Sequence, residues 1–171
     1  MLGFLVRRKL RSTEKKLGEP LDYLRHMYDT APGAFWEFVK VAKAAGYRNK
    51  LPAAPLHVAK LVAARYQDCG PCVQTVVNLA KDDGVDAGIL KATLTGRPED
   101  LPESLGDVYR FAEAVATNSG EEEKYRERLE HVFGAEAMVE LALAITIAQT
   151  FPILKRGLGF AKSCSLVKVE V

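Results

Sequence analysis

"LHVAKLVAARYQDCGPCVQTVVNLA", residues 56–80, is the stretch that decides the fold of this chain. It is rich in Ala, Lys, Leu and Val, which favour helices, and it is interrupted once, by the motif Cys69-Gly70-Pro71-Cys72. Proline is well tolerated in the first turn of a helix, where its missing N–H would have no partner. The stretch therefore predicts one helix ending at about Tyr66 and a second helix starting near Pro71.

The same four residues would suit a thioredoxin, in which a hydrophobic β-strand leads directly into a C-x-x-C motif. The residues before this motif, "LHVAKLVAARYQD", instead place Ala and basic residues at helical spacing and lack a β-branched run. No alternation of strands and helices is found elsewhere in the chain. The sequence context thus argues against a thioredoxin.

The rest of the chain has apolar residues at helical spacing nearly everywhere. Three clear sets are Phe35, Phe38, Val39 and Ala42; Val108, Phe111, Ala112 and Val115; and Tyr125, Leu129, Val132 and Phe133. The apolar segment "AEAMVELALAITIAQTF", residues 135–151, is predicted as a helix by its length and should be buried in the core or at a subunit contact. The final "SLVKVEV" has the pattern of a short strand.

Several helix ends can be predicted from capping residues. Gly84 should end the helix that follows the motif, and Asp86 should cap the next one. Ser119 with Glu122 has the spacing of a capping box, and Gly134 should close the helix it opens. The stretch Gly96–Gly106, with two prolines, is the longest candidate loop. We expect an all-α fold of seven or eight helices, with a basic arm at 1–20 and one domain at 21–171.

Composition excludes some classes of function. The 171 residues, 48% of them hydrophobic and 27% charged, suit one globular domain with a well-buried core. The 24 basic and 22 acidic residues give a net charge of +2, which is too small for the usual footprint of a nucleic-acid-binding protein. No apolar run reaches membrane-spanning length, so we expect no membrane span and a cytoplasmic protein.

The segment "MLGFLVRRKLRSTEKK" carries apolar residues ahead of a basic cluster, the reverse of the order in a secretory signal. Two interpretations fit: a basic helical arm that packs on a neighbour, and attachment to a membrane surface. The sequence leaves both open.

The cysteines at 69 and 72 point to redox chemistry. Side chains three residues apart on a helix are neighbours, so a small adjustment of the first turn can close a disulfide. The positive end of the helix dipole favours a thiolate there. A structural zinc site is the alternative, but it needs four ligands, and His57 or His131 completes no recognisable pattern with this pair. Cys164 stands alone near the C-terminus.

Over about residues 21–160 the chain resembles the alkylhydroperoxidase D and carboxymuconolactone decarboxylase superfamily. The resemblance lies in the order of its elements: a helix, a C-x-x-C motif that opens the next helix, a short helix ended by Gly, and a loop that contains Pro. The resemblance implies a compact helical bundle that assembles into trimers or hexamers, and no organic cofactor. It implies that Cys72 attacks a peroxide and that Cys69 resolves the product as a disulfide. His57 stands where the family has a Glu, and Val76 stands where it has a His, although both usually handle protons.

Valine cannot accept a proton, and loss of a general base typically slows a reaction by roughly 100 to 10,000-fold. His57 could take over this role if helix packing brings it to Cys72; otherwise it is a buried or capping residue. Tyr66, Gln74 and Thr75 could donate hydrogen bonds to a thiolate.

Three functions follow as hypotheses. The first is a thiol-disulfide oxidoreductase of peroxidase type with Cys72, Cys69 and His57 as its site, acting on a small hydroperoxide or on a protein disulfide or dithiol partner. The second is a lactone decarboxylase, the other branch of the superfamily. The third is a non-catalytic oligomeric scaffold in which the motif is a structural or regulatory disulfide.

Overall fold

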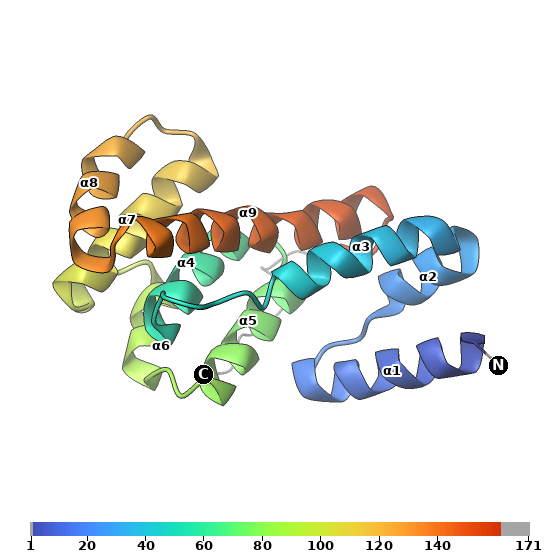
Figure 1. Cartoon of the computed structure of the whole chain (residues 1–171). Coiled ribbons are helices and arrows are strands. Elements are labelled where there is room, and N and C mark those ends of the chain that lie inside the picture. The colour runs from blue at the N-terminus through green and yellow to red at the C-terminus, as the bar shows by residue number, and fades with distance from the viewer. Residues whose placement is uncertain (1, 162–171) are drawn as a thin grey trace.

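The computed structural model describes residues 2–161, and every regular element within that range is a helix (Figure 1). The elements are α1 (Leu2–Leu17), α2 (Asp22–Thr30), α3 (Pro32–Ala44), α4 (Ala53–Tyr66), α5 (Gly70–Asp82), α6 (Ala87–Thr95), the short 3₁₀ helix η1 (Pro98–Asp100), α7 (Glu103–Thr117), α8 (Glu122–Phe133) and α9 (Ala135–Gly157). The predicted all-α fold is confirmed. Cys164 and the expected strand "SLVKVEV" lie outside the described residues.

The number of helices exceeds the expected seven or eight, because residues 2–161 contain nine α-helices. One additional break falls at Ala31, whose backbone angles of φ −143° and ψ 74° separate α2 from α3. A residue before a proline is disfavoured in helical conformation, and Pro32 follows directly. The helix break is thus set by local backbone sterics.

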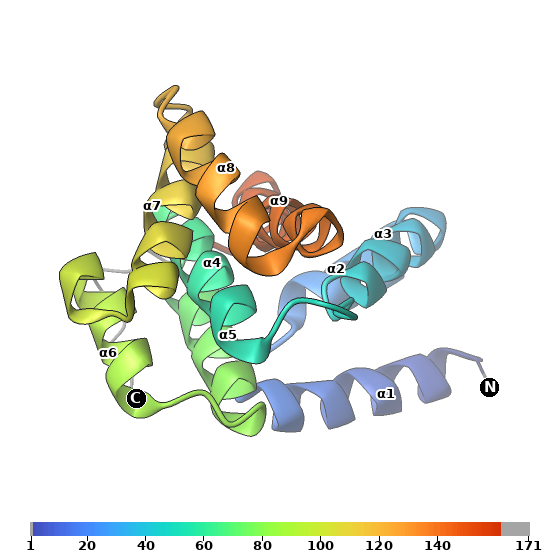
Figure 2. The same ribbon diagram turned by 60° about the vertical axis from the view of Figure 1, so that its left-hand side comes forward.

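Helix α4 is the centre of the fold, with α5, α6, α7 and α9 packed around it (Figure 2). Every residue from Pro55 to Ala64 is buried, including two polar ones, His57 and Lys60. One face packs with α7, α8 and α9 in the largest apolar cluster, and another packs with α5 and α6. A helix that is apolar all round, as this one nearly is, is expected at the core of a domain.

The long helix α9 runs from α8 across the fold to the side of α3 (Figure 1). Among the described helices it alone is long and apolar enough to cross a membrane by length and composition, and one such helix does not indicate a clear membrane span. Its contacts with α4, α7, α8 and α3 account for its apolar character, because core helices have the same composition. The segment 135–151 is only partly buried within the single chain, since Val139 is 70% exposed and Leu143 36%.

Most predicted helix ends are confirmed. α4 ends at Tyr66 and α5 begins at Gly70. Gly84 follows α5 with a positive φ of 75°, and the Asp86 carboxylate accepts hydrogen bonds from the backbone N–H groups of Gly88 and Ile89. Gly134 closes α8. The candidate loop Gly96–Gly106 is shorter than predicted, because it contains η1 and the start of α7.

The predicted capping box was wrong. α8 starts at Glu122, and the Ser119 hydroxyl accepts a hydrogen bond from the N–H of Glu121, which precedes the helix. The chain leaves α7 through Asn118 and Gly120, both with left-handed backbone angles, so Ser119 is still in the turn when the helix begins. A serine in that position cannot reach the N–H of the third helical residue.

Helices α1, α2 and α3 form a smaller packed unit beside the central bundle (Figures 1 and 2). Val6 and Leu10 of α1 share an apolar cluster with α2 and α3, and Phe151 of α9 packs against it. The basic segment at the N-terminus is therefore a helix with one buried face.

Candidate functional site at the start of helix α5

A tight turn leads from α4 into the C-x-x-C motif. Gln67 ends α4, Asp68 takes a left-handed conformation with φ 47°, and Cys69 is already the residue before the first turn of α5. Because only three residues separate the helices, α4 and α5 pack as antiparallel neighbours. The start of α4 therefore lies beside the end of α5.

Cys69 and Cys72 are joined by a disulfide, with their Cα atoms 5.3 Å apart. The carbonyl of Cys69 accepts the N–H groups of Cys72 and Val73, each at 3.0 Å, so the first turn forms with the bridge in place. The expectation that a helical first turn can hold this bridge is confirmed. Both sulfurs lie at the positive end of the α5 dipole, where a thiolate is favoured after reduction.

The two cysteines differ in access to solvent. Cys69 is 1% exposed and Cys72 is 7% exposed, so both residues are buried and Cys72 is the more exposed of the two. Behind them, Val73, Val76 and Val77 are buried in the apolar cluster between α4, α5 and α6. Val76, one turn beyond Cys72, thus contributes packing at the position where the resemblance would have an imidazole.

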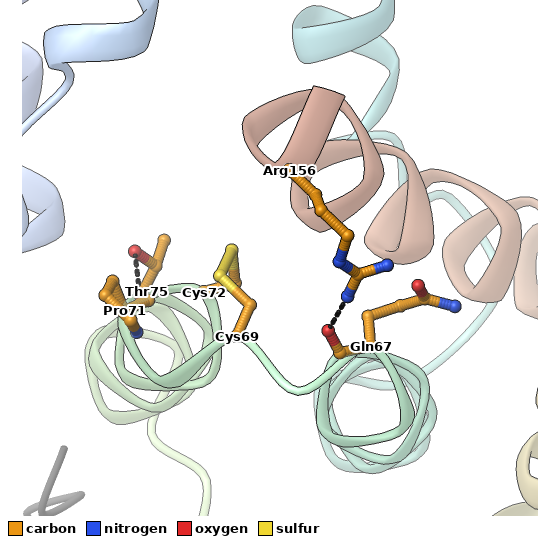
Figure 3. The surroundings of a disulfide bond; sticks show 6 residues. All are labelled: Gln67, Cys69, Pro71, Cys72, Thr75 and Arg156. Atoms are coloured by element: carbon orange, nitrogen blue, oxygen red, sulfur yellow. Dashed lines mark hydrogen bonds between the residues drawn. A yellow bond between two sulfur atoms is a disulfide. The ribbon is translucent and has the colours of Figure 1, made fainter. Parts of the chain in front are cut away.

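The turn that precedes the motif is bonded to the end of α9. Arg156 donates a hydrogen bond to the backbone carbonyl of Gln67, and Figure 3 shows its guanidinium on the side of the turn toward which the disulfide projects. This contact joins α9 to the turn that precedes Cys69. Thr75, on the next turn of α5, donates its hydroxyl to the carbonyl of Pro71 at 2.9 Å.

The other side chains considered as donors to a thiolate have partners elsewhere. Tyr66 donates to Glu113 of α7, and this hydrogen bond raises the pKa of Tyr66 to about 12. Gln74 donates to the side chain of Asn78 at 2.9 Å, and Asn78 in turn donates to the carbonyl of Leu17. The polar residues around the motif therefore serve to fix α1, α5 and α7.

His57 lies at the opposite end of α5 from the cysteines. Its Nε2 is 2.8 Å from a carboxylate oxygen of Asp83, the residue that ends α5. Asp83 is eleven residues beyond Cys72, which corresponds to about 16 Å of helix. The structure brings Cys69 and Cys72 together and leaves His57 apart from them. His131 is exposed on α8, and the ring of His26 packs against Phe160.

His57 belongs to a polar cluster with Lys60 and Asp83 that the sequence did not predict. His57 and Lys60 are buried, whereas the Asp83 side chain is 41% exposed. Burial lowers the pKa of His57, so the ring is neutral at pH 7 and donates from Nε2 to the Asp83 carboxylate. Its Nδ1 is buried without a hydrogen-bond partner in the described part of the chain. The hydrogen bond from His57 in turn lowers the pKa of Asp83.

Lys60, one turn further along α4, is 8% exposed and donates from Nζ to the carbonyl of Ala45 at 2.7 Å. Burial lowers its pKa to about 8. One signal was present in the sequence: Lys60 is the only Lys, Arg, Asp or Glu between Ala53 and Ala64, in a helix that is otherwise apolar on every side. A charged side chain in such a helix either is buried or extends its aliphatic stem so that the charged end reaches solvent.

A buried carboxylate on α9 fixes the loop between α3 and α4. Glu140 of α9 accepts the backbone N–H groups of Asn49, Lys50 and Leu51, at 3.0 Å each. These hydrogen bonds lower the pKa of Glu140. The loop that precedes α4 is therefore tied to α9, and with it Ala45, the partner of Lys60, is held near α4.

Within residues 2–161, no three His, Cys, Asp or Glu side chains are grouped closely enough to hold a metal ion. Two surface hollows lie elsewhere, one beside Asp86 and Arg97 and the other beside Asp107 and His131. Neither is lined by a cysteine of the motif. The site at the start of α5 thus consists of the two sulfurs, the helix end and the turn held by Arg156.

Comparison with protein-family models, with curated proteins and with solved structures finds no match to this chain. The site must therefore be interpreted from its own geometry.

Proposed function

We propose that this protein is a thiol-disulfide oxidoreductase that cycles Cys69 and Cys72 between dithiol and disulfide, with a hydroperoxide as oxidant. The observation that carries the proposal is the pairing of two cysteines across the first turn of α5, 5.3 Å apart at Cα, at the positive end of the helix. A disulfide there closes a very short loop, so the bond can form and break without rearranging the chain. The resemblance of the sequence to the alkylhydroperoxidase D superfamily, whose peroxidase members use such a cysteine pair, also supports this proposal.

In the oxidative step the Cys72 thiolate attacks one oxygen of a hydroperoxide ROOH, the O–O bond breaks, and ROH leaves after taking up a proton. Cys72 becomes a sulfenic acid. The Cys69 thiol then attacks that sulfur, an S–S bond forms, and water leaves. An external dithiol returns two electrons and two protons and is itself oxidised to a disulfide. Cys72 takes the first role because it is the more exposed of the two residues.

The reaction is expected to be slow compared with an enzyme that has a base beside the thiol. Val76 occupies the position one turn beyond Cys72, and His57 is bonded to Asp83 at the other end of α5. Without such a base, the helix end alone must stabilise the thiolate. Since a general base typically contributes roughly 100 to 10,000-fold, we expect a rate constant lower by that order.

The test is to reduce the full chain, add hydrogen peroxide or an alkyl hydroperoxide, quench with an alkylating reagent and measure the mass. We expect loss of two alkylation sites and appearance of a peptide containing the Cys69–Cys72 bridge. In Cys69→Ser, Cys72 should remain as a sulfenic acid that a dimedone-type reagent traps. Cys72→Ser should give neither product, and Cys164→Ser, the matched control, should behave as the parent. Retention of both thiols in the parent would refute the proposal.

A non-catalytic role is the second candidate, and the burial of Cys69 at 1% exposure favours it. In that case the bridge stabilises the turn between α4 and α5 or switches an assembly. The two candidates differ in turnover: an oxidoreductase consumes hydroperoxide repeatedly with a dithiol present, whereas a structural bridge reacts once. A structural bridge should also change the unfolding temperature or the assembly state on reduction.

A further inference from the structure

Helix α1 has two faces of different chemistry. Val6 and Leu10 are buried against α2 and α3, at 7% and 6% exposure. The opposite face is open and begins with two large apolar side chains, Phe4 at 64% and Leu5 at 55% exposure. Because the inner face is already packed, the outer face is a preformed helical surface (Figure 2).

Basic residues follow these two apolar residues along the open face. Arg8, Arg11 and Lys15 stand four, seven and eleven residues after Phe4, and Lys9 and Lys16 stand four and eleven residues after Leu5. These spacings keep side chains on one side of a helix. All five basic residues are exposed, and none forms an ion pair with another residue of the described part of the chain.

The only carboxylate of α1 is held mainly by α2, and of the five cations only Arg11 interacts with it electrostatically. Glu14 is bonded to Arg25 of α2 and to the backbone N–H of Leu21, so its negative charge is matched within the fold. Arg7 lies at the edge of the open face and is paired with Asp29 at 2.6 Å. What remains on the open face is five cations and two apolar side chains.

We propose that the open face of α1, defined by Phe4, Leu5, Arg8, Arg11 and Lys15 with their neighbours Lys9 and Lys16, binds the surface of an anionic lipid bilayer. A helix that lies in the plane of a membrane presents apolar side chains to the acyl boundary and cations to the headgroup phosphates. Phe4 and Leu5 supply the apolar side chains, and the five Lys and Arg residues supply the cations. This surface is separate from the redox pair, and the proposal does not depend on it.

Charge complementarity and the apolar pair select the bilayer over other partners. A second copy of this chain would have to present a matching acidic surface to five unpaired cations, and a nucleic acid offers no apolar layer for Phe4 and Leu5. An anionic bilayer satisfies both needs at once. A basic segment with a small apolar anchor binds such surfaces reversibly, since two signals act together.

The experiment is sedimentation of the full chain with phosphatidylcholine vesicles that contain or lack phosphatidylserine. We expect binding only with phosphatidylserine, and a decrease on addition of salt because the attraction is screened. Each Lys or Arg near an anionic surface contributes about fivefold, so replacement of Arg8, Lys9, Lys15 and Lys16 by Gln should weaken binding about a hundredfold or more. Phe4→Ser with Leu5→Ser should weaken it at least about tenfold.

The matched control removes four exposed lysines elsewhere, by Lys43→Gln, Lys50→Gln, Lys91→Gln and Lys124→Gln, and should bind as the parent does within a few-fold. Absence of parent binding to phosphatidylserine vesicles would overturn the proposal, as would equal binding of the control and the α1 variant. A parent that binds duplex DNA but no vesicles would assign the face to nucleic acid. A parent that ignores vesicles and loses its oligomeric state on Phe4→Ser with Leu5→Ser would assign it to a second copy.

Discussion

Replacement of Lys60 by Met should stabilise the protein at neutral pH. Lys60 is 8% exposed, and its burial lowers the pKa from 10.5 to about 8, with Arg48 lowering it further and Asp83 opposing both. The lowered pKa means that the folded state disfavours the ammonium, by about 3 kcal/mol. Methionine keeps most of the stem and removes the charge.

The effect has a defined dependence on pH. Below about pH 8 both the folded and the unfolded chain hold the proton, so the full penalty for burying the charge is present. Between about pH 8 and 10.5 only the unfolded chain holds it, so the unfolding free energy of the parent rises with pH in this window. Lys60→Met lacks this rise, and its advantage over the parent should disappear toward pH 10.5.

Urea unfolding of the oxidised protein, followed by circular dichroism at several pH values, measures this directly. After loss of the hydrogen bond to Ala45, worth about 1 kcal/mol, we expect Lys60→Met to be more stable than the parent by about 2 kcal/mol at pH 7. Lys91→Met, an exposed lysine on α6, is the control and should change little. A variant that is less stable than the parent at pH 7, or a difference that does not vary with pH, would refute the reasoning.

Three further outcomes are expected. Asp83→Asn should lower stability by about 1 kcal/mol by weakening its bond to His57 and should leave the rate of Cys72 oxidation unchanged; a tenfold slower oxidation, measured by stopped flow, would mean that this pair acts on the thiol. Val76→His should speed oxidation of Cys72 at least about tenfold, because it adds a base one turn away, and no gain in a folded variant would contradict this. Arg156→Gln should lower the unfolding free energy by about 1 kcal/mol and should make reduction of the disulfide faster, as measured by thiol release; unchanged values would show that its bond to the turn is dispensable.

The helical fold was predictable because its signals are local. The break at Cys69-Gly70-Pro71-Cys72 lies where α4 ends and α5 begins, and Asp86 caps α6 as its residue type suggests. Periodicity of apolar residues and capping chemistry act over one or two turns, so a single sequence contains them. The disulfide belongs to the same class, since three residues of helix geometry suffice to bring the sulfurs together.

The surroundings of the site depend on contacts between distant segments. The position of His57 follows from the antiparallel packing of α4 on α5, which turns the start of one helix toward the end of the other. Arg156 reaches Gln67 across 89 residues of sequence, and Glu140 reaches Leu51 across a similar span. No pattern in a single sequence specifies such pairs, because many polar residues compete for each partner. The capping box predicted at Ser119 was wrong for a local reason. Asn118 and Gly120, on either side of Ser119, have positive φ angles, and the helix therefore starts later, at Glu122.

The central claim is that Cys69 and Cys72 form a reversible redox pair, and catalytic consumption of hydroperoxide tests it most directly. With an excess of a dithiol reductant, the parent and Cys164→Ser should consume many equivalents of an alkyl hydroperoxide per protein, and Cys72→Ser should consume none above background. Equal consumption by Cys72→Ser and the parent, or consumption of a single equivalent, would contradict the claim.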